Sequence, residues 1–151
     1  MRIVPKSGPE VTVEIHVEFY QEFKNRYLPM AQGKAAIYFV RLAAAGFAIS
    51  FDFYDKDRFI GAFAGKNYLR YEADPGEHLF WAASENHEFL TAELAEGGIY
   101  VVVVDVEMGF AVARVGLSPL RSTDKLFERA QKLVDKKGPK IPDADKVAES
   151  N

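Results

Sequence analysis

The chain has no cysteine, which excludes disulfides, thiolate metal ligands, cysteine nucleophiles and thiol-linked lipid anchors. Histidine is scarce: His16, His78 and His87 form no HExxH motif and no closely spaced pair on a strand. No serine stands in a nucleophile-elbow motif, and the glycines are scattered rather than placed between a strand and a helix. The sequence therefore predicts no catalytic residue, no metal and no cofactor.

Long apolar runs and dense basic blocks are also missing. The longest nearly uncharged stretch, Leu42 to Phe51, falls short of the roughly 20 residues that a membrane helix needs, so no transmembrane segment is expected. The 19 Lys and Arg against 22 Asp and Glu give a net charge of -3 and no phosphate-binding footprint, so no nucleic acid is expected. The N-terminus lacks the apolar run of a secretory signal, which predicts a cytoplasmic protein as written, or a periplasmic or envelope protein if a leader was removed.

What is present is a core: 48% of the 151 residues are hydrophobic, enough for one soluble globular domain. Short strand candidates recur at intervals of about ten residues with turn residues between them, which is typical of a β-sandwich or barrel. We predict an all-β fold, a β-sandwich of about 8–9 short antiparallel strands, with one C-terminal amphipathic α-helix. The expected organisation is an N-terminal extension at residues 1–32, the sandwich at 33–120, the helix at 121–138 and a flexible tail at 139–151.

Period-2 alternation or continuous apolar runs mark the individual strands. The expected strands are residues 11–19, 35–40, 47–53, 58–63, 67–73, 77–83, 89–94, 99–106 and 110–117. The first could continue as a helix, because apolar residues also recur every four positions there, and residues 20–32 stay open between helix and strand. The run at 35–40 is expected to be covered on both faces and that at 99–106 to be central.

Turn residues fix the expected connections between these strands. Asp55 and Asp57 are expected to be solvated residues of a hairpin turn. Pro75 and Gly76 fit a type II turn that returns the chain as a second hairpin. Pro119 is expected to end the last strand, because proline has no N–H for the ladder.

The C-terminal segment changes period. Its apolar residues form one helical stripe at Leu126, Phe127, Ala130, Leu133 and Val134. Ser122, Thr123 or Asp124 is the expected N-cap, and Gly138 followed by Pro139 is the expected stop.

Aromatic residues offer the best candidate for binding. Tyr68, Tyr71, Phe80 and Trp81 fall on two successive predicted strands and are expected to lie close in space. An aromatic outer face that also carries Arg70 would stack on a sugar or on a partner's side chain, whereas the competing interpretation is ordinary cross-strand packing. The candidate ligand- or partner-binding residues are Arg41, Tyr68, Arg70, His78 and Trp81.

Three segments in order carry a resemblance: GKAAIYFVR at 33–41, the stretch from FYDKDRFIG to YLRYEADPGEHLFWA at 53–82, and LAEGGIYVVVVDV at 94–106. The chain resembles, over roughly residues 20–120, a bacterial family of small β-domains of unknown function, many of them periplasmic or lipid-anchored, and is distantly similar to PEGA-type modules. The matching positions are Arg41, Tyr68, Tyr71, Pro75, Gly76, His78 and Tyr100. The resemblance implies a β-sandwich and no established activity. The missing leader and lipobox cysteine, and the added helix, depart from the family pattern.

Together these features predict a non-enzymatic binding or interaction module whose partner is another protein or a second copy. The alternative is a small-ligand binding protein, for example for carbohydrate, or an enzyme with a pocket between sheet and helix. Arg70 and His78 would be the first candidates for such a pocket.

Overall fold

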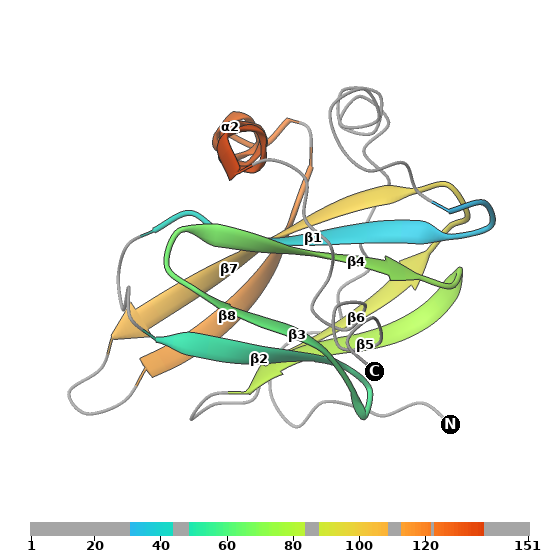
Figure 1. The fold of residues 1–151 in the computed structure, drawn as a ribbon, viewed down its shortest axis with the longest axis horizontal. Helices are drawn as coiled ribbons and strands as arrows, with labels where there is room; N and C mark the ends of the chain where they lie inside the picture. The colour runs from blue at the N-terminus through green and yellow to red at the C-terminus, as the bar shows by residue number, and fades with distance from the viewer. Residues whose placement is uncertain (1–30, 44–48, 84–87, 109–112, 122, 138–151) are drawn as a thin grey trace.

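A computed structural model describes residues 31–43, 49–83, 88–108, 113–121 and 123–137. The strands are β1 Ala35–Arg41, β2 Ser50–Asp55, β3 Arg58–Ala64, β4 Asn67–Ala73, β5 Gly76–Ala83, β6 Glu88–Leu94, β7 Ile99–Met108 and β8 Ala113–Leu120, followed by helix α2 Phe127–Lys137 (Figure 1). The predicted strand at 11–19 and the predicted tail at 139–151 lie outside the described residues.

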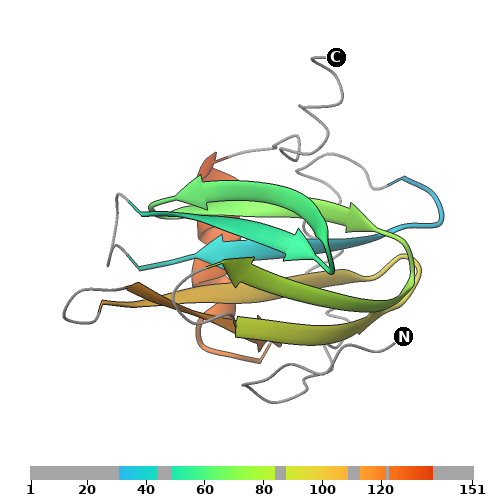
Figure 2. The ribbon, with the colours of Figure 1, turned by 90° about the horizontal axis from the view of Figure 1, so that it is seen from below.

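The strands form two four-stranded sheets that stack face to face (Figure 2). Sheet A has the order β4-β1-β7-β8, and sheet B has the order β3-β2-β5-β6. All neighbours pair antiparallel except β1 and β7, which are parallel, for example with Ile37 opposite Tyr100. The all-β sandwich with one C-terminal helix is therefore confirmed, whereas the expectation that all strands are antiparallel is wrong for β1 and β7.

The main core lies between the inner faces of the two sheets. Phe39 of β1 sits at its centre, with ring centroids 5.3 Å from Phe53 and 5.4 Å from Phe80. Phe53 also stacks on Phe63 at 5.2 Å. Along every strand except β3, alternate residues point into this layer, which is why period-2 alternation identified the strands. In β3 a bulge opposite Phe53 and Tyr54 places Ile60 and Phe63 inward.

A second apolar layer lies between the outer face of sheet A and α2 (Figure 1). It is built from Ala36, Tyr38, Val40, Leu42, Tyr68, Ile99, Val101, Val103, Leu120, Phe127, Ala130 and Val134. This layer explains why all seven residues of β1 are buried, as the apolar run predicted. β7 is likewise interior in its sheet, as predicted.

The predicted hairpin between β4 and β5 is wrong. The turn at Pro75 is present and Gly76 has φ 121°, but β4 pairs with β1 and β5 pairs with β2, so the chain crosses from one sheet to the other. As a consequence Tyr71 and Phe80 meet across the core at 6.2 Å, whereas Tyr68 and Trp81 lie on opposite outer faces. Local turn chemistry does not determine which ladder a strand joins.

Two boundaries also differ from expectation. Pro119 lies within β8, opposite Val102, because β8 is the edge strand of sheet A and a missing N–H is tolerated there. The helix begins at Phe127 rather than at 121, and the Asp124 carboxylate accepts the Arg121 backbone N–H at 2.7 Å instead of capping α2. Ser122 lies outside the described residues.

Candidate functional site

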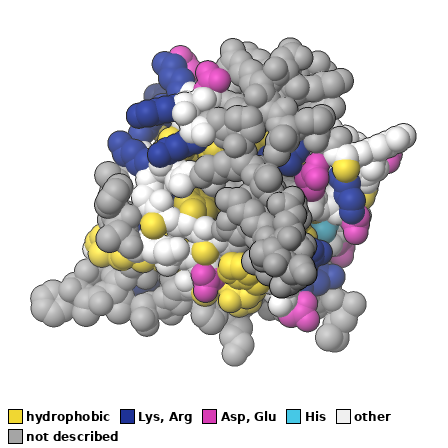
Figure 3. Space-filling model, viewed as in Figure 1, with side chains coloured by type: hydrophobic (Ala, Val, Ile, Leu, Met, Phe, Trp, Pro, Cys, Tyr) yellow, Lys and Arg dark blue, Asp and Glu magenta, His cyan; other side chains and the backbone are white. Residues whose placement is uncertain are grey.

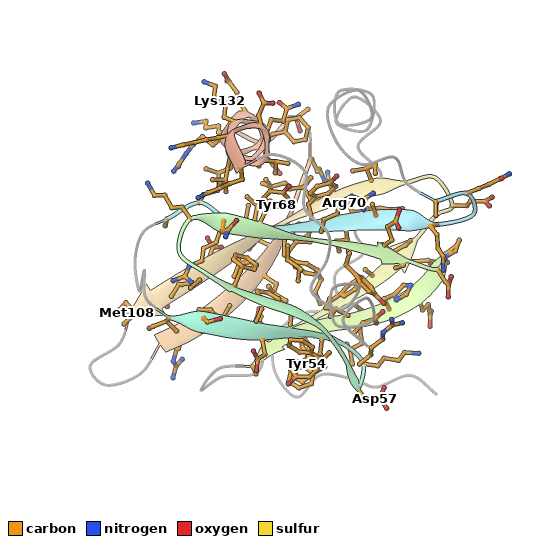
Figure 4. The ribbon with its side chains drawn as sticks, in the orientation of Figure 1. Tyr54, Asp57, Tyr68, Arg70, Met108 and Lys132 are labelled. Atoms are coloured by element: carbon orange, nitrogen blue, oxygen red, sulfur yellow. The ribbon has the colours of Figure 1, made fainter. Side chains whose placement is uncertain are left out.

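The five candidate residues are distributed over four places in the fold. Arg41 and His78 lie in the sandwich interior at opposite ends, Tyr68 and Arg70 lie on the outer face of sheet A, with Tyr68 in the layer under α2, and Trp81 lies on the outer face of sheet B. Only Tyr68 and Arg70 are brought together, as strand alternation predicted. Figure 4 shows the side chains of Tyr68 and Arg70 on the side of sheet A that carries α2.

Arg41 ends β1 and is only 1% exposed. Its Nη1 donates to the Ile49 carbonyl at 2.7 Å, and its guanidinium carbon lies 5.4 Å from the centroid of the Phe51 ring. Burial lowers the pKa of Arg41 from its ordinary value. The guanidinium thus connects β1 to the segment entering β2, which is a structural role.

Arg70 and two tyrosines form a polar cluster on the outer face of sheet A. Arg70 Nε donates to the Tyr38 hydroxyl at 3.0 Å, and Arg70 Nη2 lies 3.3 Å from a Glu72 carboxylate oxygen. The Tyr38 and Tyr68 rings lie 5.9 Å apart. Burial raises the pKa of Tyr38 and of Tyr68, so both hydroxyls stay protonated. Tyr38 and Tyr68 thus belong to the second apolar layer, and the buried Arg70 has the Tyr38 hydroxyl and Glu72 among its partners.

His78 joins the β4–β5 crossover to the end of β2. Its Nδ1 lies 2.7 Å from Asp55 Oδ2, and its Nε2 lies 2.6 Å from the Asp74 carbonyl oxygen. Both neighbours are acceptors, so both ring nitrogens must donate, which only the protonated imidazolium can do. An imidazole with both nitrogens engaged in this way is not available as a general base.

Asp55 is the centre of this cluster and is not the solvated turn residue that the sequence predicted. Its side chain is 10% exposed and also accepts the Tyr71 hydroxyl at 3.3 Å. Burial, followed by the charge of Asp55, raises the pKa of Tyr71 to about 12, so this hydroxyl remains a donor. Asp57, two residues further on, is exposed as predicted (Figure 4).

The His78 cluster predicts a pH-dependent stability. Burial alone lowers the pKa of His78, but its hydrogen bonds to Asp55 and to the Asp74 carbonyl outweigh burial, so the net pKa is raised; Asp55 adds an attractive charge and Lys56 a repulsive one. A raised folded-state pKa gives stability that is fully present below the unfolded pKa of about 6.5 and is lost as pH rises through the folded pKa. We expect the free energy of unfolding, measured in urea between pH 6 and 9, to fall with pH more in the wild type than in His78→Gln. Equal slopes would show that His78 is not held in the charged form.

Trp81 belongs to a row of four aromatic side chains across the outer face of sheet B. Phe59 of β3 pairs with Tyr54 of β2, Tyr54 pairs with Trp81 of β5, and Trp81 pairs with Phe89 of β6. The row therefore crosses every strand of the sheet at one level. Figure 4 shows Tyr54 on the side of sheet B that faces away from sheet A. We call these four residues the aromatic row.

Neighbouring rings of the aromatic row pack directly against one another. Tyr54 and Trp81 stack with centroids 4.3 Å apart and planes at 13°, while Phe59 meets Tyr54 at 5.8 Å and 70°. Trp81 and Phe89 lie 5.8 Å apart at 35°. The Trp81 Nε1–H donates to the Lys56 carbonyl at 2.6 Å, which fixes the indole. The two central rings thus have aromatic neighbours on both sides, and Phe59, at the end of the row, is 41% exposed.

Sequence reasoning named Trp81 but missed Tyr54, Phe59 and Phe89. Tyr54 and Phe89 point outward by simple alternation along their own strands, and that signal was available, whereas a bulge in β3 breaks the alternation between Phe59 and the inward-facing Phe63. Their alignment depends on the neighbours and register of β2, β3, β5 and β6, which arise from the crossover between sheets. The expected β4–β5 hairpin instead grouped Trp81 with Tyr68, Tyr71 and Phe80.

Three carboxylates lie on the same face as the aromatic row. Asp52 of β2, Glu77 of β5 and Glu93 of β6 are all exposed. Glu77 and Glu93 are directly opposite each other in the ladder, and like charges in that position destabilise a sheet slightly. The outer face of sheet B therefore combines an apolar row with three carboxylates, while the exposed cations Lys56 and Arg58 lie at the β2–β3 turn beside Phe59.

A separate pocket of about 290 Å³ opens beside β8 and is lined by Glu88, Asp105, Glu107, Arg114, Val115 and Gly116. Burial raises the pKa of Asp105 and of Glu88, and Ser118 Oγ, 3.4 Å from Asp105 Oδ2, opposes the first shift. None of the six described lining residues carries a hydroxyl, thiol or imidazole. Within the described residues no three His, Asp or Glu side chains gather as metal ligands, and no described helix has the length and apolarity to cross a bilayer.

The resemblance to the bacterial family of small β-domains rests on residues 20–120 and stays a prediction, as does the location. Comparisons with protein-family models, with curated proteins and with solved structures give no match to this chain.

Proposed function

We propose that the protein is a non-enzymatic interaction module that binds a protein partner through the aromatic row. The observation that carries the proposal is the alignment of Tyr54, Phe59, Trp81 and Phe89 at one level across all four strands of sheet B. Tryptophan and tyrosine are enriched among the residues that dominate binding energy at protein interfaces. A row of them on a rigid sheet is preorganised, so little ordering entropy is lost on binding.

The ring arrangement favours a protein over a sugar. A sugar stacks on the open face of an aromatic ring, whereas Tyr54 stacks on Trp81 and meets Phe59 on its other side. A partner's apolar side chain can instead pack against ring edges and against Phe59. The exposed Asp52, Glu77 and Glu93 add negative charge on this face, so the partner is expected to place Lys or Arg opposite these carboxylates.

The alternative of an enzyme or carrier with a pocket between sheet and helix has less support. Tyr38, Tyr68, Phe127, Ala130 and Val134 are all buried in the layer between sheet A and α2, so side chains occupy that space. His78, one of the two residues expected to serve such a pocket, lies in the sandwich interior with both nitrogens engaged.

Site-specific photo-crosslinking tests the proposal with an internal control. Among the residues that the structure describes, Phe59 and Met108 are the two exposed large hydrophobic ones, at 41% and 53%, and Met108 lies at the far end of β7. With p-benzoylphenylalanine in place of one or the other, we expect a discrete adduct from position 59 and none from position 108. An adduct of twice the chain mass identifies a second copy as the partner.

Charge-removing variants test whether the crosslinked partner is held by the carboxylates of this face. In the chain carrying the probe at 59, the variant Glu77→Gln, Glu93→Gln is expected to weaken the adduct, because it removes the charges that would face the partner's cations. The matched variant Glu107→Gln, Glu128→Gln removes two exposed carboxylates elsewhere and is expected to leave it intact. Equal crosslinking at 59 and 108, or none at 59, would overturn the proposal.

A further inference from the structure

Helix α2 carries its charges on separate sides. Its apolar stripe is used against sheet A. Lys125, in the turn before the helix, and Arg129, Lys132 and Lys136 follow at intervals of four, three and four residues, which places them along one side at about 100° per residue. All four are exposed, and Figure 3 shows Lys and Arg side chains gathered over α2.

Lys66 extends this group from the neighbouring sheet. Arg129 Nη2 approaches the Leu42 carbonyl at 3.5 Å, so this side of α2 faces the end of β1. Arg41, the residue before Leu42, pairs with Asn67, which follows Lys66 in the β3–β4 turn. The exposed Lys66 therefore lies on the same side of α2. We call Lys66, Lys125, Arg129, Lys132 and Lys136 the basic row.

The two carboxylates of α2, Glu128 and Asp135, are exposed and lie to one side of the basic row. Lys132, the member of the basic row nearest to them, lies 3.1 Å from Glu128. The chain as a whole carries a net charge of -3. Five cations on one surface are therefore a local feature and do not reflect a basic composition.

We propose that the basic row is a second interaction surface, which binds an acidic polypeptide segment. From Lys125 to Lys136 the row spans about 16 Å, the length of roughly five residues of extended chain. A segment with several Asp or Glu in succession can place carboxylates along all of it, and each exposed pair adds a modest, salt-sensitive attraction. This proposal rests on α2 and is independent of the aromatic row.

Other anionic partners fit the geometry less well. A flat anionic membrane would meet the top of α2 and therefore Glu128 and Asp135 together with the cations, and the apolar stripe is already used against sheet A. A single-stranded nucleic acid is held by aromatic side chains on which bases stack, and the basic row contains none. An acidic peptide needs only the row of charges.

The test measures fluorescence anisotropy of a fluorescein-labelled decaglutamate peptide titrated with the full chain at low salt. We expect saturable binding that weakens with added salt, and Lys132→Glu, Lys136→Glu should weaken it about tenfold, because two attractions become repulsions. The control Lys56→Glu, Arg58→Glu makes the same change in net charge at the β2–β3 turn, away from α2, and should change the dissociation constant by less than about twofold. Circular dichroism and thermal unfolding confirm that both variants fold.

Three results would overturn the proposal. The first is equal weakening by the two double variants, which would show that net charge alone governs binding. The second is no binding of the peptide at all. The third is equal or tighter binding of labelled decathymidylate or of phosphatidylserine vesicles, which would assign the basic row to a different class of partner.

Discussion

Val134→Asp is expected to destabilise the protein by about 3 kcal/mol, which for a chain of this size lowers the melting temperature by about 10 °C. Val134 is completely buried in the layer between α2 and sheet A. A carboxylate there has no cation among the residues of that apolar cluster, so it must either remain unpaired or force α2 away from the sheet. Thermal unfolding followed by circular dichroism measures the change.

The neighbouring exposed position supplies the control. Lys132→Asp introduces the same side chain two residues earlier and removes one surface ion pair with Glu128, which costs about 0.5 kcal/mol at most. If Val134→Asp melts at the same temperature as Lys132→Asp, α2 does not contribute to the core, and the second apolar layer between α2 and sheet A does not stabilise the fold.

Asp55→Ala is expected to cost about 3 kcal/mol, because one carboxylate oxygen is the shared acceptor for His78 and Tyr71. Without it a largely buried imidazolium and a buried hydroxyl lose their partner at once. The variant should also lose the pH dependence assigned to His78, since the attraction that helps to hold the proton is gone. Urea unfolding at pH 6 and pH 9 measures both effects.

Asp57→Ala is the matched control, because Asp57 lies in the same turn and is exposed. Its loss should change stability by less than about 0.5 kcal/mol. Asp55→Asn separates charge from hydrogen bonding, since the amide oxygen can still accept while the attraction for the imidazolium is lost. Similar stabilities for Asp55→Ala and Asp57→Ala would contradict the account of the His78 cluster.

The strands themselves were predictable because each has an inner face that must be apolar. Phe51 and Phe53 of β2 alternate with exposed or half-buried residues, and residues 67–73 coincide with β4. Which strands pair with each other was harder to predict from the sequence. The turn at Pro75 suits a hairpin equally well, yet β4 pairs with β1, which is far away along the chain. Such long-range pairings depend on total burial, which no local pattern contains.

The candidate sites, like the strands, could be predicted where local alternation decides and not where long-range strand pairing decides. Strand alternation placed Tyr68 and Arg70 together correctly, and it identified Trp81 as pointing away from Phe80. It could not supply the strand order that aligns Trp81 with Tyr54 and Phe89. Asp55 illustrates a further limit, because its partner His78 is 23 residues away along the chain and no local pattern around Asp55 indicates that contact.

The most direct test of the central claim uses Trp81, the single tryptophan of the chain, as a reporter within the aromatic row. The partner captured by crosslinking at position 59 is titrated into the unmodified protein while the emission of Trp81 is recorded. We expect a saturable change in emission, and we expect Phe59→Asp to weaken binding by about thirtyfold or more while leaving the melting temperature unchanged. Binding that leaves the Trp81 emission constant and is equally tight in Phe59→Asp would contradict the assignment of the aromatic row as the interaction surface.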